Sequence, residues 1–104
     1  MFRFEELEIW KLSITYARLM YGLANNFPKI EQFALADQLR RVAVSISNNI
    51  AEGSGGTSKD FSNFLSIAIK STLETVNILY IAKTLSYISE NERIRYYQEA
   101  EKND

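Results

Sequence analysis

The sequence predicts an all-α protein, arranged as an antiparallel up-down four-helix bundle with a short fourth helix. Apolar residues recur at alternating spacings of three and four along most of the chain, as they do on the buried side of a helix. Residues that break helices are few, because Pro28 is the only proline and three of the four glycines lie between positions 53 and 56. No segment alternates between apolar and polar residues as cleanly as a strand does.

The composition suits one domain, which we expect to cover residues 1–104. A chain of this size has room for a single core and gains buried area by oligomerising. With 46% hydrophobic and 24% charged residues, long disordered stretches are not expected. Apolar runs are too short for a membrane span, and the N-terminus lacks the pattern of a signal peptide. We therefore expect a cytoplasmic protein without a membrane partner.

Two apolar series predict the first helix, over residues 4–26. The first reads as the seam that faces the bundle, and it consists of Leu7, Trp10, Ile14, Ala17, Tyr21 and Ala24. The second has the same spacing, rotated by roughly 140°, and it consists of Ile9, Leu12, Tyr16, Leu19 and Leu23. Because only a narrow strip is left for water, we expect the second series to be an interface between subunits. The alternative is a broad core-facing surface on a centrally placed helix.

Pro28 ends the first helix, because proline cannot donate to a continuing helix and pushes the preceding residue out of the helical region. The second helix is predicted over residues 34–54. It ends where Gly53, Gly55 and Gly56 can supply the left-handed or extended angles of a helix terminus.

The third helix is predicted over residues 58–85, with Ser58 as its N-cap and Asp60 placed to favour the helix dipole. Its apolar residues read as the buried side of an ordinary amphipathic helix. Ser89 followed by Glu92 has the form of a capping box. This pair predicts the fourth helix, over residues 89–102, which has little apolar content.

A polar stripe runs along the second helix beside its apolar residues. It consists of Arg41, Ser45, Asn49 and Glu52. Solvent exposure alone does not require this pattern. We interpret the stripe, together with Glu74 on the third helix, as a hydrogen-bonded network that fixes the register of the bundle. Removing Arg41 from such a buried network is expected to cost roughly 3–5 kcal/mol. The alternative is a ligand-binding role.

The sequence has no cysteine and no histidine, which excludes disulfides, thiolate nucleophiles, imidazole bases and most zinc or iron sites. The remaining reactive side chains have no identifiable partner, so we expect no enzyme, no cofactor and no small-molecule substrate. Glu52 and Glu74 lie on different helices, and without histidine such a carboxylate-only site is a weak metal candidate. The glycine loop is not a Walker motif, since Lys59 is followed by Asp60.

Arg40, Lys59 and Lys70 are the candidate contacts to nucleic acid, with several tyrosines as stacking faces. The formal net charge of -1 argues against a surface that is cationic throughout. Ion pairs with the neighbouring carboxylates are the competing interpretation.

Motifs spread over nearly the whole chain carry a resemblance to a known family. They are Phe4-x-x-Leu7-x-Ile9-Trp10, Phe27-Pro28-x-x-Glu31, the stretch from Gln38 to Gly53, Phe61-x-x-Phe64-Leu65-x-Ile67-Ala68, and Ser71-x-x-Glu74. In these motifs the chain resembles the four-helix-bundle family of the protein encoded in the intervening sequence of bacterial 23S rRNA genes, also called the S23 ribosomal protein family.

The resemblance implies a bacterial homopentamer with a central channel and no established enzymatic activity. A relation to ribosomal RNA is suggested mainly by gene location. A related group, the accessory proteins of diversity-generating retroelements, implies the alternative of a scaffold that binds RNA or nucleoprotein. This chain departs from the pattern at Gly56 and Asn63, where a basic residue is usual, while Lys70 stands where glycine is common. These departures weaken the nucleic-acid interpretation.

We therefore expect a non-enzymatic homo-oligomer of unknown cellular role. Neither the biological process nor the identity of an RNA or protein partner follows from the sequence.

Overall fold

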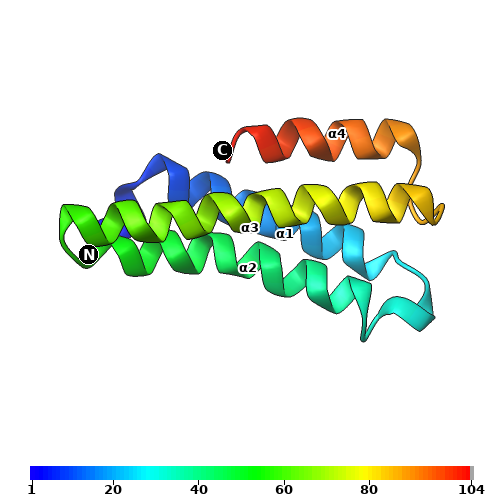
Figure 1. Ribbon diagram of the computed structural model, residues 1–104, viewed down its shortest axis with the longest axis horizontal. Coiled ribbons are helices and arrows are strands. Elements are labelled where there is room, and N and C mark those ends of the chain that lie inside the picture. Colours follow the sequence, from blue (N-terminus) through cyan, green and yellow to red (C-terminus); the bar gives the residue numbers. More distant parts are fainter. Residues whose placement is uncertain (104) are drawn as a thin grey trace.

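The computed structural model describes residues 1–103, and its elements are helices (Figure 1). The long helices are α1 (Glu8–Asn25), α2 (Leu35–Ser54) and α3 (Ser58–Thr84), followed by the shorter α4 (Glu90–Glu101). Two 3-10 helices, η1 (Arg3–Glu6) and η2 (Lys29–Glu31), precede α1 and α2. No strand occurs among these 103 residues. The predicted all-α four-helix architecture is confirmed.

The first helix begins later than predicted. Residues Arg3–Glu6 form η1, and Leu7 is extended, with φ -79° and ψ 125°, so the regular helix starts at Glu8. The break lets the chain fold back, and the Phe4 ring packs edge-on against Trp10 at a centroid distance of 5.0 Å. Aromatic pairs prefer this geometry, which ties η1 to α1.

The glycines at the end of α2 do not supply the left-handed or extended angles that were predicted for this helix terminus. None of the four glycines, all of which lie within the described residues, has a positive φ, and Gly55 caps the helix with φ -84° and ψ -6°. Gly53 is required instead for close packing, because a Cβ placed there would lie 2.6 Å from the Cβ of Phe64 on α3. The small size of Gly53 therefore allows α2 and α3 to approach each other where the chain turns.

Both later helices begin with a capping box. In α3 the N-cap is Thr57 rather than Ser58: the Asp60 amide donates to Thr57 Oγ1 at 3.1 Å, and the Thr57 amide donates to Asp60 Oδ2 at 2.9 Å. These bonds lower the pKa of Asp60. The predicted pair of Ser89 and Glu92 caps α4 as expected.

The core lies between α1, α2 and α3. Its largest fully buried side chains come from all three helices, and they include Tyr16, Met20, Leu39, Ile46, Ile78 and Leu79. One polar contact crosses this core. The hydroxyl oxygens of Tyr16 on α1 and Thr75 on α3 lie 2.8 Å apart and share a hydrogen bond. Burial raises the pKa of Tyr16 to about 12.

The fourth helix covers only part of α3. It starts beside the C-terminal end of α3 and runs back along it, with its last turn near Thr72 and Leu73 (Figure 1). The N-terminal half of α3 lies beyond the end of α4. This leaves side chains of α3 uncovered on the side where a longer fourth helix would pack.

α3 is long and apolar enough, by length and composition, to cross a bilayer, and this corrects the expectation that no segment meets that test. A third of its most apolar window, 33%, is buried inside the bundle. Core helices of other proteins pass the same test, so this one helix is weak evidence for a membrane span.

Candidate functional site

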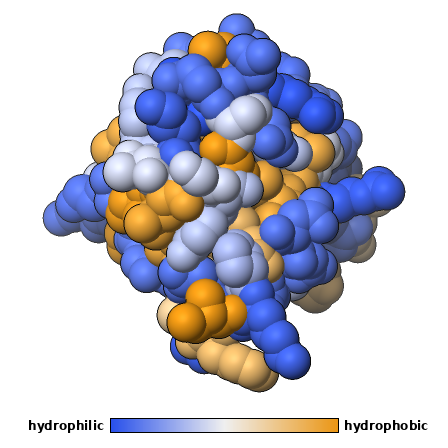
Figure 2. Space-filling view, turned by 90° about the vertical axis from the view of Figure 1, so that its right-hand side faces the viewer, coloured by the Kyte–Doolittle hydropathy of each residue, from blue (hydrophilic) through white to orange (hydrophobic). Residues whose placement is uncertain are grey.

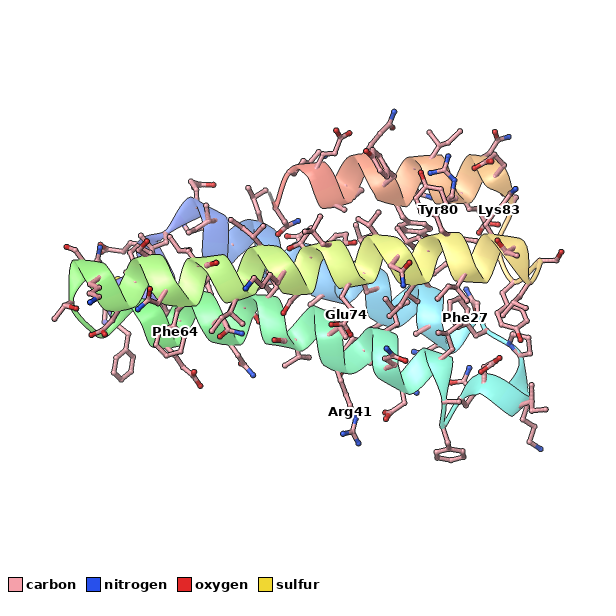
Figure 3. The ribbon with its side chains drawn as sticks, in the orientation of Figure 1. Phe27, Arg41, Phe64, Glu74, Tyr80 and Lys83 are labelled. Carbon is pink, nitrogen blue, oxygen red and sulfur yellow. The ribbon has the colours of Figure 1, made fainter. Side chains whose placement is uncertain are left out.

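Arg41 lies on the surface and not in a buried network, which corrects the sequence-based interpretation. Its guanidinium points away from the bundle (Figure 3), and its side chain is 80% exposed. Its Nε donates to Asp37 Oδ2 at 2.8 Å, one helical turn earlier. Exposed pairs of this spacing contribute little to stability.

Part of the predicted stripe does link two helices. Ser45 on α2 and Ser71 on α3 share a hydrogen bond between their hydroxyl oxygens, which lie 3.0 Å apart. Asn49 Nδ2 donates to the Ser45 carbonyl at 2.7 Å and to its hydroxyl at 3.1 Å. The polar contact between α2 and α3 is therefore made by a small neutral group of three side chains, and its role in fixing the register stays a prediction.

The two glutamates of the proposed network lie outside this group. Glu52 and Glu74 are exposed, and Figure 3 labels Glu74 on α3, close to the α2 ribbon in that view. Neither side chain makes a hydrogen bond or ion pair within residues 1–103. The same part of the chain holds no cluster of three or more acidic residues able to bind a metal ion.

The series on α1 that was predicted to face another subunit faces its own chain over most of its length. Tyr16 and Leu23 are buried, and Leu19 packs against the same core. Leu12 is half-buried, and Ile9 keeps 41% of its surface exposed. The physical reason is that α1 packs along α2 with this side turned into the three-helix core, where the Tyr16 hydroxyl reaches Thr75 of α3. Tyr16 and Leu23 are therefore unavailable to a second subunit.

Large apolar side chains are exposed instead on two other parts of the bundle. On α1 they belong to the series that was predicted to face the core, and they are Ile14 and Tyr21. On α3 they are Ile67, Ile69, Leu73, Tyr80 and Ile81, and the C-cap Leu85 follows directly. The sequence held part of this signal, because α3 carries large apolar residues outside its buried seam as well as within it.

Arg40 is not free to contact nucleic acid. Its guanidinium donates to the Gln32 carbonyl at 2.7 Å, to Gln32 Oε1 at 3.2 Å and to Asn25 Oδ1 at 3.1 Å. Lys59 and Lys70 are exposed on α3. The three candidate cations are thus not gathered into one site.

A cluster of tyrosines and charged residues joins α3 to α4. The Arg93 guanidinium lies 4.5 Å from the ring centroid of Tyr80 and 6.0 Å from that of Tyr97. Arg93 also pairs with Glu90, whose carboxylate lies 3.7 Å from Lys83 Nζ, and Figure 3 shows Tyr80 and Lys83 on the side of α3 that faces α4. The Arg93 bond lowers the pKa of Glu90. Because the Arg93 side chain is mostly buried between the two helices, the cluster holds α4 against α3.

The connection between α1 and α2, residues 26–34, forms a tip at one end of the molecule. Of its three large apolar side chains, Phe27 is buried against Tyr87, but Ile30 is 85% exposed and Phe33 is 98% exposed. Figure 2 looks at this end of the bundle and shows hydrophobic groups projecting among hydrophilic ones at its lower edge. The sequence pattern contained no sign that these side chains would be left in water.

A hollow of about 190 Å³ lies on the flank of the bundle, where α4 ends. Its lining is almost wholly apolar, and consists of Ile9, Ile50, Leu65, Ala68, Ile69 and Asn103. The Oδ1 atom of Asn103 is buried without a hydrogen-bond partner in the part of the chain that the structure describes. Most of the lining therefore offers a contacting molecule carbon atoms rather than hydrogen-bonding groups.

Comparison with known proteins identifies a family whose sequence model matches most of the chain. The sequence model of the family described as "23S rRNA-intervening sequence protein" matches residues 5–103. No curated protein matches the chain.

Proposed function

Since the chain belongs to the 23S rRNA-intervening sequence protein family, we propose that it is a non-enzymatic helical bundle that works by assembling with copies of itself. The observation that carries this proposal is the apolar surface of α3, where Ile67, Ile69 and Leu73 are 46%, 42% and 59% exposed. Burying large apolar side chains of this kind against a partner is favourable, because it removes their surface from water.

The chemistry of the chain supports a role without catalysis. Cysteine and histidine are missing from the sequence. Tyr16, a buried side chain with a shifted pKa, is held in the core by Thr75 and lies away from solvent. Asp60 and Glu90 owe their lowered pKa to a helix cap and to an ion pair, and Tyr87 owes its raised pKa to its hydrogen bond to Glu31. Each of these shifts has a structural cause.

The subunit number is proposed from the family resemblance as five, in a bacterial cytoplasm. Size exclusion with multi-angle light scattering tests the assembly at micromolar concentration. We expect a mass several times the 12.0 kDa of one chain. A mass of one chain at all concentrations up to about 1 mM would refute the proposal, since specific association weaker than that is marginal.

The alternative is a scaffold that binds RNA or nucleoprotein. Its support is the family's link to a ribosomal RNA gene, together with the exposed Lys59 and Lys70 on α3. The acidic neighbours Asp60 and Glu74 reduce the field of these two lysines. Binding to structured RNA at several salt concentrations tests the alternative, because phosphate contacts make affinity fall steeply as salt rises. No binding at low salt would remove it.

A further inference from the structure

We propose that α4 opens separately from the other three helices, so that the side of α3 beneath it, at Thr72, becomes accessible while the core stays folded. The inference concerns a motion within one chain. It goes beyond the self-association proposed above and does not rest on it.

The contact between α4 and the rest of the chain buries little. Figure 1 shows α4 lying along α3 on the outside of the bundle. Of the twelve residues of α4, all within the described part of the chain, Ala100 alone is buried, whereas α2 buries eight residues and α3 buries seven. Ile94 and Tyr97 keep 41% and 37% of their surface exposed. Because stabilisation by burial scales with the apolar area removed from water, α4 is held less firmly than the core helices.

The turn that leads into α4 belongs to the core. Ile88 is 5% exposed, and the Tyr87 hydroxyl donates to a Glu31 carboxylate oxygen at 2.7 Å. The Tyr87 ring also packs on Phe27, at a centroid distance of 5.6 Å. An opening motion of α4 therefore pivots after Ile88, and the turn stays in place.

Polar groups near the start of α4 hold it against α3. The Arg93 guanidinium lies over the Tyr80 ring, and Glu90 pairs with Lys83 across 3.7 Å. The Glu90 and Lys83 side chains are 50% and 43% exposed, so their pair adds little. The Arg93 side chain is only 14% exposed. We therefore expect α4 to depend on Arg93 more than on the ion pair to Lys83.

The far end of α4 is poorly packed. A cleft of about 140 Å³ lies beside its last turns, where Tyr97 and Glu101 border α3. The hollow of about 190 Å³ lies where α4 ends, and the buried Asn103 Oδ1 has no hydrogen-bond partner in the part of the chain that the structure describes. Lys102 pairs with Glu99 of α4 itself and not with α3. Empty space beside a helix loses dispersion contacts, and an unpaired buried acceptor favours a state in which water reaches it.

These contacts allow α4 to open by itself. A released helix of twelve residues is marginal in water, so its backbone amides lose their protection when it leaves α3. Such local openings need much less free energy than unfolding of the whole chain. Opening would uncover Thr72, which is 2% exposed and lines the cleft together with Ala100. Thr72 would then join its exposed neighbours Ile69 and Leu73 on one side of α3.

A single introduced cysteine can report this opening, because the sequence contains none. Thr72→Cys places a thiol beneath α4, and Ser71→Cys places one on the neighbouring residue, which shares a hydrogen bond with Ser45 of α2. In the closed structure Ser71 is 9% exposed, more than Thr72 at 2%. We nevertheless expect the Thr72→Cys thiol to react with iodoacetamide at least about 10 times faster, as a local opening gives. Circular dichroism checks that both variants fold.

The dependence on Arg93 separates opening of the whole helix from fraying of its last turn. Arg93→Ala removes the contact to Tyr80, about two turns of α3 away from Thr72, and should speed the labelling of Thr72→Cys roughly 10-fold. The labelling of Ser71→Cys should stay unchanged. Arg95→Ala is the matched control, because this side chain is exposed and lies over the ring of the next residue of α4, and it should change neither rate.

Hydrogen exchange of the wild type, followed by mass spectrometry, is a second measurement that needs no substitution. Peptides from α4 should exchange at least about 100 times faster than peptides from residues 39–50 of α2. Equal exchange in the two segments would overturn the inference, and so would labelling of Ser71→Cys as fast as that of Thr72→Cys.

Two further results would also overturn it. In the first, Arg93→Ala leaves the labelling of Thr72→Cys unchanged, as fraying of the last turn alone predicts. In the second, Arg93→Ala speeds the labelling of Thr72→Cys and Ser71→Cys equally, as unfolding of the whole chain predicts. Neither result bears on the mass of the assembly, so the proposed function is tested separately.

Discussion

The middle of the bundle and its tip differ in where they place large apolar side chains. In the middle, the hydroxyl groups of Tyr16 and Thr75 are turned inward and paired, and apolar side chains surround them. At the tip, polar groups such as the Gln32 amide are again turned inward, but Ile30 and Phe33 are left in water. The difference separates residues that hold the fold from residues that are free to contact another molecule.

Substitutions in the two regions should follow the same division. Changes in the middle should lower the free energy of unfolding, whereas changes at the tip should leave it nearly unchanged. Unfolding is best compared at one low protein concentration, because association also stabilises the folded state by mass action.

The largest effect is expected for Leu39→Ala in the middle of α2. Leu39 is 0% exposed, so its truncation leaves a cavity and should lower the free energy of unfolding by about 2–5 kcal/mol. Phe33→Ala is the matched control at the tip and should leave that free energy nearly unchanged. Urea denaturation measures both, and equal losses in the two variants would show that the middle and the tip do not differ.

The next effect is a loss of stability at high pH that comes from Tyr16. Its pKa is about 12 in the folded chain and near 10 in the unfolded chain, so its stabilising contribution is complete below pH 10. As pH rises from 10 to 12, Tyr16 loses its proton in the unfolded state while it is still protonated in the folded state. The free energy of unfolding should fall by about 2–3 kcal/mol over this range. Denaturation at several pH values measures it, and Tyr16→Phe should remove this part of the pH dependence.

A smaller effect is expected where α2 and α3 share neutral polar groups. Ser45→Ala removes the bond to Ser71 and one of the two bonds from Asn49, which should lower the free energy of unfolding by about 1 kcal/mol. Ser66→Ala, at an exposed serine of α3, is the control. A cost equal to that of the control would mean that the three side chains do not fix the register.

The smallest effect is expected for Arg41→Ala. Its side chain is 80% exposed and pairs with Asp37 one turn away, so we expect a cost of at most about 0.5 kcal/mol. Thermal unfolding measures it. A cost of several kcal/mol would contradict this expectation and would instead support the buried network that the sequence suggested.

Periodicity predicted the helices well because the spacing of apolar residues reports directly on helical faces. It could not say which of two seams on α1 faces the core, since both are equally apolar. That choice depends on how α1 is rotated when it packs on α2, as the burial of Tyr16 and the exposure of Ile14 illustrate. Thr57 and Asp60 did carry a capping signal in the sequence, one residue before the predicted cap.

The tip could not be predicted from local sequence. Pro28 indicates a break, but the turn that carries Phe33 is fixed by Gln32, Arg40 and Tyr87, which come from three different parts of the chain. The predicted polar network was wrong for a related reason. Its residues share a helical face, but the contact to α3 is made by the small hydroxyl of Ser45 and not by the longer charged side chains.

The most direct test is the dependence of the thermal midpoint on protein concentration, measured for the wild type and for Leu73→Asp on α3. If the exposed apolar side chains of α3 join copies, the wild-type midpoint should rise by several degrees over a roughly 100-fold range of concentration, on the order expected from mass action. The midpoint of Leu73→Asp should stay constant. A wild-type midpoint that does not move, or one that moves equally in both proteins, would contradict the account.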